Sequence, residues 1–99
     1  MMRKKIEIIV PVRFLDDVTE ILDQQKIGGF TVMNIVKGRG RHGDAFSDGV
    51  ISANENIYLF LIANEEQHDR LLDHIVPLLN TYGGLLFSSD VDLYSGSTP

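Results

Sequence analysis

The sequence predicts a single α+β domain, and three observations support this class. Short runs rich in β-branched residues alternate with segments in which apolar residues recur every three or four positions. These segments follow one another as strand, helix, strand, and then again as strand, helix, strand. The length of 99 residues fits one domain, 1–99, and an apolar content of 43% can fill one core.

The first half of the chain opens with a predicted strand at 5–10, KIEIIV. A helix is predicted over 14–26, because four apolar residues fall on one helical face. Asp16 and Asp17 suit its first turn, where the helix dipole favours negative charge. Gly28–Gly29 are expected to end this helix, and a second strand is predicted at 30–37, FTVMNIVK.

The second half follows a polar segment without periodicity. Residues 56–62, NIYLFLI, are almost wholly apolar and predict a central strand. Asn64 with Gln67 resembles an N-terminal capping box, so a helix is expected to begin there. An apolar stripe at helical spacing supports this helix, formed by Leu71, Leu72, Ile75, Val76 and Leu79. Pro77 is a flaw in the pattern, since proline inside a helix removes a backbone hydrogen bond and kinks the axis.

The second helix is expected to end at Gly83–Gly84. A last strand is predicted at 85–94, LLFSSDVDLY, followed by a frayed tail at 95–99. The resulting order βαββαβ is the ferredoxin-like pattern, in which right-handed crossovers place both helices on one face of a four-stranded antiparallel sheet. Because the strand at 30–37 carries apolar residues on both faces, we expect the bare sheet face to be buried between subunits.

Composition excludes several classes of protein. The absence of cysteine excludes a disulfide framework, a thiolate nucleophile and a cysteine-based zinc site. Without a long apolar run or a signal peptide, we expect a soluble, cytoplasmic protein with no membrane insertion. The net charge of −5 and the pI near 4.9 argue against nucleic acid as a partner, since duplex binding needs a broad basic face.

A local basic cluster nevertheless stands at 37–43, KGRGRHG, at the start of a long loop predicted over 38–55. Glycines such as Gly38 and Gly40 let backbone N–H groups converge on an anion. Lys37, Arg39 and Arg41 alternate, so in an extended segment they project to one side and could hold phosphate. The motif is neither a Walker A loop nor a dinucleotide fingerprint, and a solvated basic loop remains the alternative.

Four segments resemble the PII signal-transduction superfamily: FLDDVTEIL at 14–22, GGFTV at 28–32, KGRGR at 37–41 and YGGLLFSSDVDLYSG at 82–96. The spacing before KG is more similar to the PII-like branch linked to inorganic-carbon uptake and carboxysomes than to classical nitrogen-regulatory PII. The resemblance implies a homotrimer with adenine-nucleotide clefts between subunits. It also implies that the loop, the family's T-loop, contacts a protein target such as a membrane transporter or an enzyme.

The resemblance also implies roles for individual residues. Phe30 and Thr31 would contact the adenine, although a strand threonine chosen for β propensity is the alternative for Thr31. Gly28 and Gly29 would let the base approach the backbone. Gly84 and Leu85 would close the cleft from the neighbouring subunit, and Lys37–Arg41 would hold the phosphates.

Two departures from the pattern of classical PII proteins narrow the choice of the expected ligand. Residues 38–56 contain no tyrosine, so the uridylylation of classical PII proteins is not expected. Where classical members grip ATP with basic residues near the last strand, this chain has Leu85 and Asp92, and acidic side chains repel a triphosphate. We therefore expect AMP, ADP or a cyclic adenine nucleotide over ATP as effector, with bicarbonate as an effector of some members and no tightly bound cofactor.

Two other classes of function remain as alternatives. A small ferredoxin-like enzyme would need a positioned base, but the sequence shows no Ser–His or Cys–His pairing and its histidines look exposed. A ferredoxin-like trimer that handles divalent cations is weakened by the lack of cysteine and by scattered histidines. We expect a regulator rather than an enzyme, with no metal site.

Overall fold

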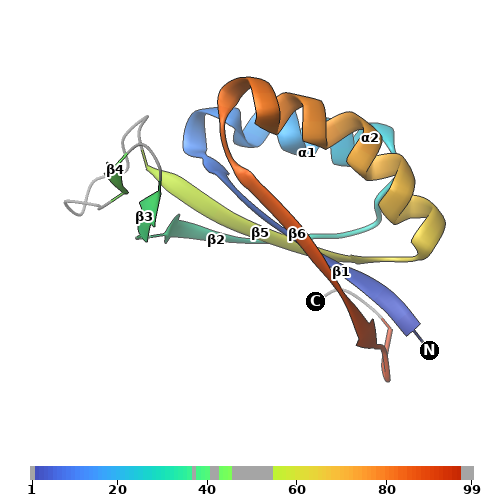
Figure 1. Ribbon diagram of the computed structural model, residues 1–99. Helices are drawn as coiled ribbons and strands as arrows, with labels where there is room; N and C mark the ends of the chain where they lie inside the picture. The colour runs from blue at the N-terminus through green and yellow to red at the C-terminus, as the bar shows by residue number, and fades with distance from the viewer. Residues whose placement is uncertain (1, 37, 41–42, 46–54, 97–99) are drawn as a thin grey trace.

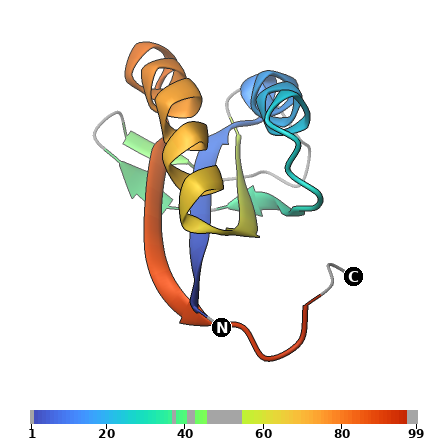
Figure 2. The ribbon, with the colours of Figure 1, turned by 90° about the vertical axis from the view of Figure 1, so that its right-hand side faces the viewer.

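The structure is a computed structural model that describes residues 2–36, 38–40, 43–45 and 55–96. Its main sheet has four strands in the order β2-β5-β1-β6, and every neighbouring pair is antiparallel. The bounds of these strands are Met2–Pro11 for β1, Thr31–Val36 for β2, Asn56–Ala63 for β5 and Leu85–Asp92 for β6. Helices α1 (Leu15–Gln24) and α2 (Glu65–Tyr82) both cover the same face of the sheet (Figure 1, Figure 2). The predicted ferredoxin-like fold is confirmed.

The core lies between the sheet and the two helices. Alternate residues of the central strands point into it, as the period-two pattern of a strand requires. The helices add an apolar stripe at helical spacing. The most deeply buried side chains are Ile6, Ile8 and Val10 of β1, Ile57, Leu59 and Leu61 of β5, Val18 and Leu22 of α1, and Leu71 and Ile75 of α2.

The opposite face of the sheet carries no helix and is largely apolar. Residues paired across the strands share a face, so the register aligns two rows: Met33, Tyr58, Ile9 and Leu85, then Thr31, Phe60, Glu7 and Phe87. Met33, Leu85 and Phe87 are 58%, 55% and 42% exposed in the single chain. An apolar surface of this kind, bare on a monomer, is typical of a protein–protein contact.

Glu7 lies near the centre of this bare face and is held by polar contacts. The Tyr58 hydroxyl donates a 2.6 Å hydrogen bond to Glu7 Oε1, and Lys5 Nζ lies 3.7 Å from the same oxygen. Burial first, and then the hydrogen bond to Glu7, raise the pKa of Tyr58 to about 12. Lys5 Nζ also lies 5.3 Å from the centre of the Phe60 ring.

Helix α1 ends earlier than the sequence predicts. Its last residue is Gln24, and Lys26, with φ of 59°, adopts the left-handed conformation that usually calls for glycine. The N–H of Lys26 donates to Asp23 O and that of Ile27 to Leu22 O, which is the Schellman arrangement. The expected stop at Gly28–Gly29 is therefore wrong, because Lys26 forms the cap and the buried Leu22–Ile27 pair secures it.

Helix α2 begins as predicted. Asn64 Oδ1 accepts from the Gln67 N–H at 2.8 Å, and Gln67 Oε1 accepts from the Asn64 N–H at 3.0 Å, so the capping box is present. The helix runs through Pro77 as one element, so the proline that weakens the sequence pattern does not interrupt it. Packing of its apolar stripe against the sheet outweighs the loss of one backbone bond. It ends at Gly83, whose φ is 93°.

The predicted loop over 38–55 is not wholly irregular. Strands β3 (Gly38–Gly40) and β4 (Gly43–Ala45) form a separate two-stranded sheet in which Arg39 is paired with Asp44. Strands of three residues are too short for hydrophobic periodicity to reveal them. It projects from the end of the main sheet opposite to the start of β1 and the end of β6 (Figure 1). No helix within the described ranges is long and apolar enough to cross a membrane.

Candidate functional site

A cavity of about 360 Å³ lies at the end of the sheet where β2 begins and β5 ends. Four segments far apart in the sequence meet there: the start of β1, the entry to β2, the β5–α2 junction and the chain after β6. Its lining residues are Arg3, Gly29, Phe30, Thr31, Phe60, Leu61, Ile62, Ala63, Asn64, Gln67, Leu93, Ser95 and Gly96.

The cavity combines apolar walls with a few polar groups. Phe60 and Thr31 are paired across β5 and β2, so both face the bare side of the sheet. Phe30 and Leu93 add apolar surface, while Arg3 is the charged residue among the described residues that line it. This composition is typical of a site for a small organic ligand, in which the apolar walls provide affinity and the polar groups fix orientation.

Three of the residues predicted to contact adenine come together in this cavity: Gly29, Phe30 and Thr31. Gly28 precedes them but does not line it, and no atom lies within 4 Å of the position that a Cβ on Gly28 would take. The fold therefore does not require glycine at position 28.

The other predicted residues lie elsewhere. Gly38, Arg39 and Gly40 form β3, beyond the far end of β2, whereas Lys37 and Arg41 fall outside the described residues. Gly84 and Leu85 lie at the start of β6, on the opposite edge of the sheet from β2. Gly84 is required by packing, because a Cβ there would lie 2.7 Å from Leu79 Cδ2 and 3.0 Å from the Ile9 carbonyl oxygen.

Thr31 and Leu85 are too far apart to share one small ligand within a chain. Their strands are the two edges of the sheet, three strand spacings or about 14 Å apart. The register adds two residues, or about 7 Å along the strands, because Thr31 aligns with Glu7 and Leu85 with Ile9. A site that uses both groups must combine two copies of the chain.

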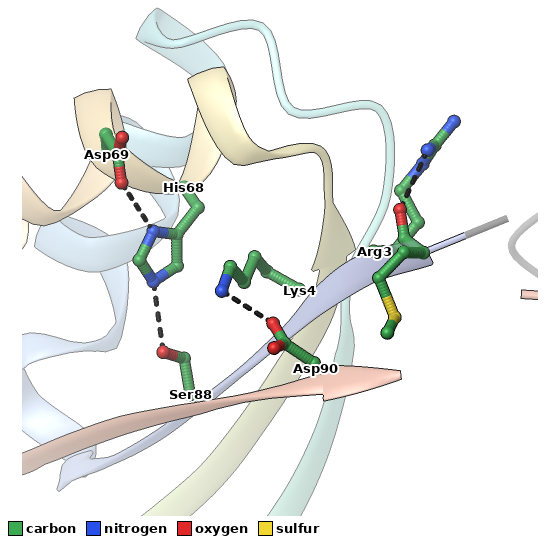
Figure 3. A network of polar contacts seen from close by, with 7 residues as sticks. Arg3, Lys4, His68, Asp69, Ser88 and Asp90 are labelled. Atoms are coloured by element: carbon green, nitrogen blue, oxygen red, sulfur yellow. Dashed lines mark hydrogen bonds and ion pairs between the residues drawn. The ribbon is translucent and has the colours of Figure 1, made fainter. Parts of the chain in front are cut away.

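A serine–histidine–aspartate chain, which sequence reasoning missed, links α2 to β6 (Figure 3). His68 Nδ1 lies 2.8 Å from Asp69 Oδ1, and Nε2 lies 3.0 Å from Ser88 Oγ. Because the Asp69 carboxylate only accepts, Nδ1 donates to it, and in the tautomer protonated at Nδ1 the Nε2 atom accepts from the Ser88 hydroxyl. The His68 side chain is only 12% exposed, so the expectation of an exposed histidine is wrong here.

The contacts of Asp69, His68 and Ser88 connect α2 to β6. Neither His68 nor Ser88 is among the described residues that line the cavity above, so these contacts lie apart from the candidate ligand site. The neighbouring Lys4 Nζ lies 2.5 Å from Asp90 Oδ1, which raises the pKa of Lys4 (Figure 3). Within the described ranges, no three histidine, aspartate or glutamate side chains gather as metal ligands.

Sequence reasoning also missed Arg3, and assigned Asn64 and Gln67 a purely structural role. The capping pattern located both amides correctly, but only the fold shows that they line the cavity. Arg3, Lys4 and Lys5 form one basic run in the sequence. Strand alternation sends Lys4 to the helix-covered face and leaves Arg3 on the other, so the run alone does not single out Arg3.

Comparison with known proteins agrees with this fold. The family model described as "Nitrogen regulatory protein P-II" matches residues 3–95. No curated protein is significantly similar in sequence. Among solved structures, CPII of Thiomonas intermedia K12, a nitrogen regulatory PII-like protein bound to ADP, AMP and bicarbonate, is similar with a TM-score of 0.81. The two are 25% identical over 92% of this chain and 87% of that one.

Two further structures are similar. CPII of the same organism bound to ADP and bicarbonate has a TM-score of 0.82 and 25% identity, over 92% of this chain and 87% of that chain. A PII-like signalling protein of Thermus thermophilus has a TM-score of 0.75 and 18% identity, over 92% and 88% of the two chains, and supports the fold alone. With the family model matched over almost its whole length, the chain belongs to the nitrogen regulatory protein P-II family, on its CPII-like branch.

Proposed function

We propose that the protein is a homotrimeric regulator that binds an adenine nucleotide between subunits and signals to a protein target through the segment 38–55. The observation that carries the proposal is the cavity in which Gly29, Phe30 and Thr31 meet the bare face of the sheet. CPII, 25% identical and of the same fold, is bound to ADP and AMP. The apolar walls beside Thr31 suit a planar base.

The cleft is proposed to combine two half-sites from neighbouring subunits. One subunit contributes the cavity around Thr31, which takes the base. The next contributes Gly84 and Leu85 at the start of β6, with Lys37–Arg41 for the phosphates. In a single chain these groups lie on opposite edges or at opposite ends of the sheet, so association is what would bring them together.

The bare sheet face supports the proposed trimer. Met33, Leu85 and Phe87 are between 42% and 58% exposed, and their burial against other copies removes apolar surface from water. The Glu7–Tyr58 hydrogen bond lies among them and satisfies the carboxylate before association. Small domains bury a modest fraction of their surface alone, so such contacts also add stability.

AMP, ADP or a cyclic adenine nucleotide is proposed as the effector in preference to ATP. In the last strand Asp92 is exposed, whereas Asp90 is paired with Lys4. Leu85 lies where a basic residue could have held a phosphate. Each further phosphate adds negative charge that Asp92 repels. Binding would order the base of segment 38–55 and shift its conformers toward those that bind or release a target, such as a membrane transporter or an enzyme of carbon metabolism.

The test is calorimetric titration of the purified protein with ATP, ADP, AMP, cyclic AMP and cyclic di-AMP, with and without Mg²⁺ and bicarbonate. We expect micromolar affinity for one or two of the smaller or cyclic ligands. The double substitution Arg39→Ala/Arg41→Ala is expected to weaken binding at least tenfold, because two charge-assisted phosphate contacts are lost. Arg70→Gln is the charge control, since Arg70 lies on α2, in the helix layer, and does not line the cavity.

Two results would contradict the proposal. Tight binding of Mg-ATP alone would overturn the proposed nucleotide preference. If none of the nucleotides tested binds, nucleotide sensing itself would be overturned. The oligomer is tested separately by analytical ultracentrifugation, where we expect a species of three times the 11.1 kDa chain mass. Phe87→Glu should dissociate it, because the charge would have to be buried in the apolar face.

A further inference from the structure

We propose that the cavity recognises a hydrogen-bond acceptor on the edge of its ligand, and that Asn64 and Gln67 are the residues that recognise this acceptor. The inference rests on the proposed function, because the acceptor concerned belongs to the adenine base. It goes further by naming the groups that select the base. These groups come from the β5–α2 junction.

The capping box fixes which atoms of the two amides remain available. Asn64 Oδ1 and Gln67 Oε1 each accept a hydrogen bond from a backbone N–H of the other residue. A backbone N–H can only donate, so both side-chain oxygens must face the helix N-terminus. What remains on each side chain is its NH₂ group, which can only donate. In the part of the chain that the structure describes, neither NH₂ group has a hydrogen-bond partner.

Arg3 adds a third donor to the same cavity. Its neighbours Lys4 and Lys5 are matched with carboxylates, at 2.5 Å from Asp90 and 3.7 Å from Glu7. Among the described residues Arg3 has no carboxylate partner, and its guanidinium donates only to the adjacent Met2 carbonyl at 3.1 Å (Figure 3). The guanidinium cannot accept a hydrogen bond. The charged and amide side chains of the cavity are therefore all donors.

A lining of donors is matched by the acceptor atoms of a purine. Adenine carries three ring nitrogens that accept, including N1 on its Watson–Crick edge. Because neither amide NH₂ group can accept a hydrogen bond, each can pair with such a nitrogen but not with the exocyclic amino group of the base. The geometry thus favours a base bound through one of its ring nitrogens.

The experiment uses substitutions that keep the helix cap but change the donor. Asn64→Ser retains a capping oxygen and removes the amide donor without adding charge. Gln67→Glu retains the capping box, in which glutamate is a usual partner, and replaces the donor with an acceptor. Glu66→Gln is the matched control, since Glu66 lies in the same helical turn, has a side chain that is 86% exposed and does not line the cavity.

Binding of AMP is measured by calorimetry, and thermal unfolding is followed in parallel. We expect Asn64→Ser to weaken binding about threefold to tenfold, the effect of one neutral hydrogen bond. Gln67→Glu should weaken it further, because a carboxylate then faces the acceptor of the base. Neither variant should lower the unfolding temperature by more than a few degrees, and Glu66→Gln should bind as the wild type does.

Ligands that lack a single ring nitrogen test the same contact from the other side. Against the wild type, one of 1-deaza-, 3-deaza- and 7-deaza-AMP should lose about as much affinity as Asn64→Ser does. Against Asn64→Ser that analogue should lose little more, since the shared contact is already gone. If the wild type binds AMP and both variants bind it with the same affinity, the inference is overturned but nucleotide sensing still stands. No binding of any adenine nucleotide to the wild type overturns both.

Discussion

The two glycine pairs of the sequence look alike, yet the structure gives their members opposite roles. Gly84 has φ of 134°, and a Cβ there would lie 2.7 Å from Leu79 Cδ2 and 3.0 Å from the Ile9 carbonyl oxygen. Gly28 has open space around the same position. The same change, glycine to alanine, should therefore be destabilising at position 84 and nearly neutral at position 28.

The expected magnitude follows from these contacts. Forcing a methyl group into a packed site costs about 1–3 kcal/mol. A residue with a side chain held at a positive φ of this kind costs about 1–3 kcal/mol more. The Leu79 side chain can move, whereas the Ile9 carbonyl is part of the sheet, so we expect about 3 kcal/mol in total for Gly84→Ala. For a domain of this size that corresponds to a fall of roughly 12–24 °C in unfolding temperature.

Urea unfolding of both variants and the wild type, at one protein concentration, measures this difference. The concentration must be held constant because an oligomer unfolds with a concentration-dependent midpoint. The slope with denaturant should stay unchanged, which shows that stability and not the extent of unfolding has altered. A Gly84→Ala variant within 1 kcal/mol of the wild type, or a Gly28→Ala variant destabilised to the same degree, would refute the reasoning.

Three further predictions concern single residues. The pKa of Tyr58 is raised to about 12 from 10, so its contribution to folding stability should be constant below pH 10 and be lost as the pH rises from 10 to 12. Chemical unfolding at several pH values measures this loss, which should be smaller in Tyr58→Phe. Ser88→Ala should cost about 1 kcal/mol in urea unfolding through the lost hydrogen bond to His68, and no loss would mean that the bond is not formed. Lys26→Gly should raise stability by up to about 1 kcal/mol, because φ at this position is 59°, and a fall in unfolding temperature would contradict the assigned cap.

The order of the elements could be predicted from the sequence because hydrophobic periodicity is a local signal. Strand β5 is apolar along its length, and the Asn64–Gln67 capping box marks the start of α2. The end of α1 could not be predicted in the same way. The left-handed residue there is Lys26, whose conformational cost is outweighed by the burial of Leu22 against Ile27, and only the folded core shows that pair.

The cavity illustrates the same difference at the level of the site. Residues 28–31, GGFT, are predicted to contact the ligand because they resemble a segment of a known family, and three of these four residues line the cavity. Arg3 and Ser95, near the two ends of the chain, also line it. Their approach depends on β6 returning beside β1, a pairing of residues about ninety positions apart. Contacts of such sequence separation follow from topology and leave no local pattern to read.

The placement of the two proposed half-sites would make the function of such a small domain depend on the proposed oligomer. β2 and β6 are the two edges of the sheet, and each carries one group of candidate ligand contacts. A ligand that bridges subunits binds only the associated state, so it stabilises the oligomer by the same free energy with which association favours the ligand. Segment 38–55 begins beyond the end of β2 opposite to Thr31, so in the proposed assembly a ligand held partly by its basic residues would bias its conformers.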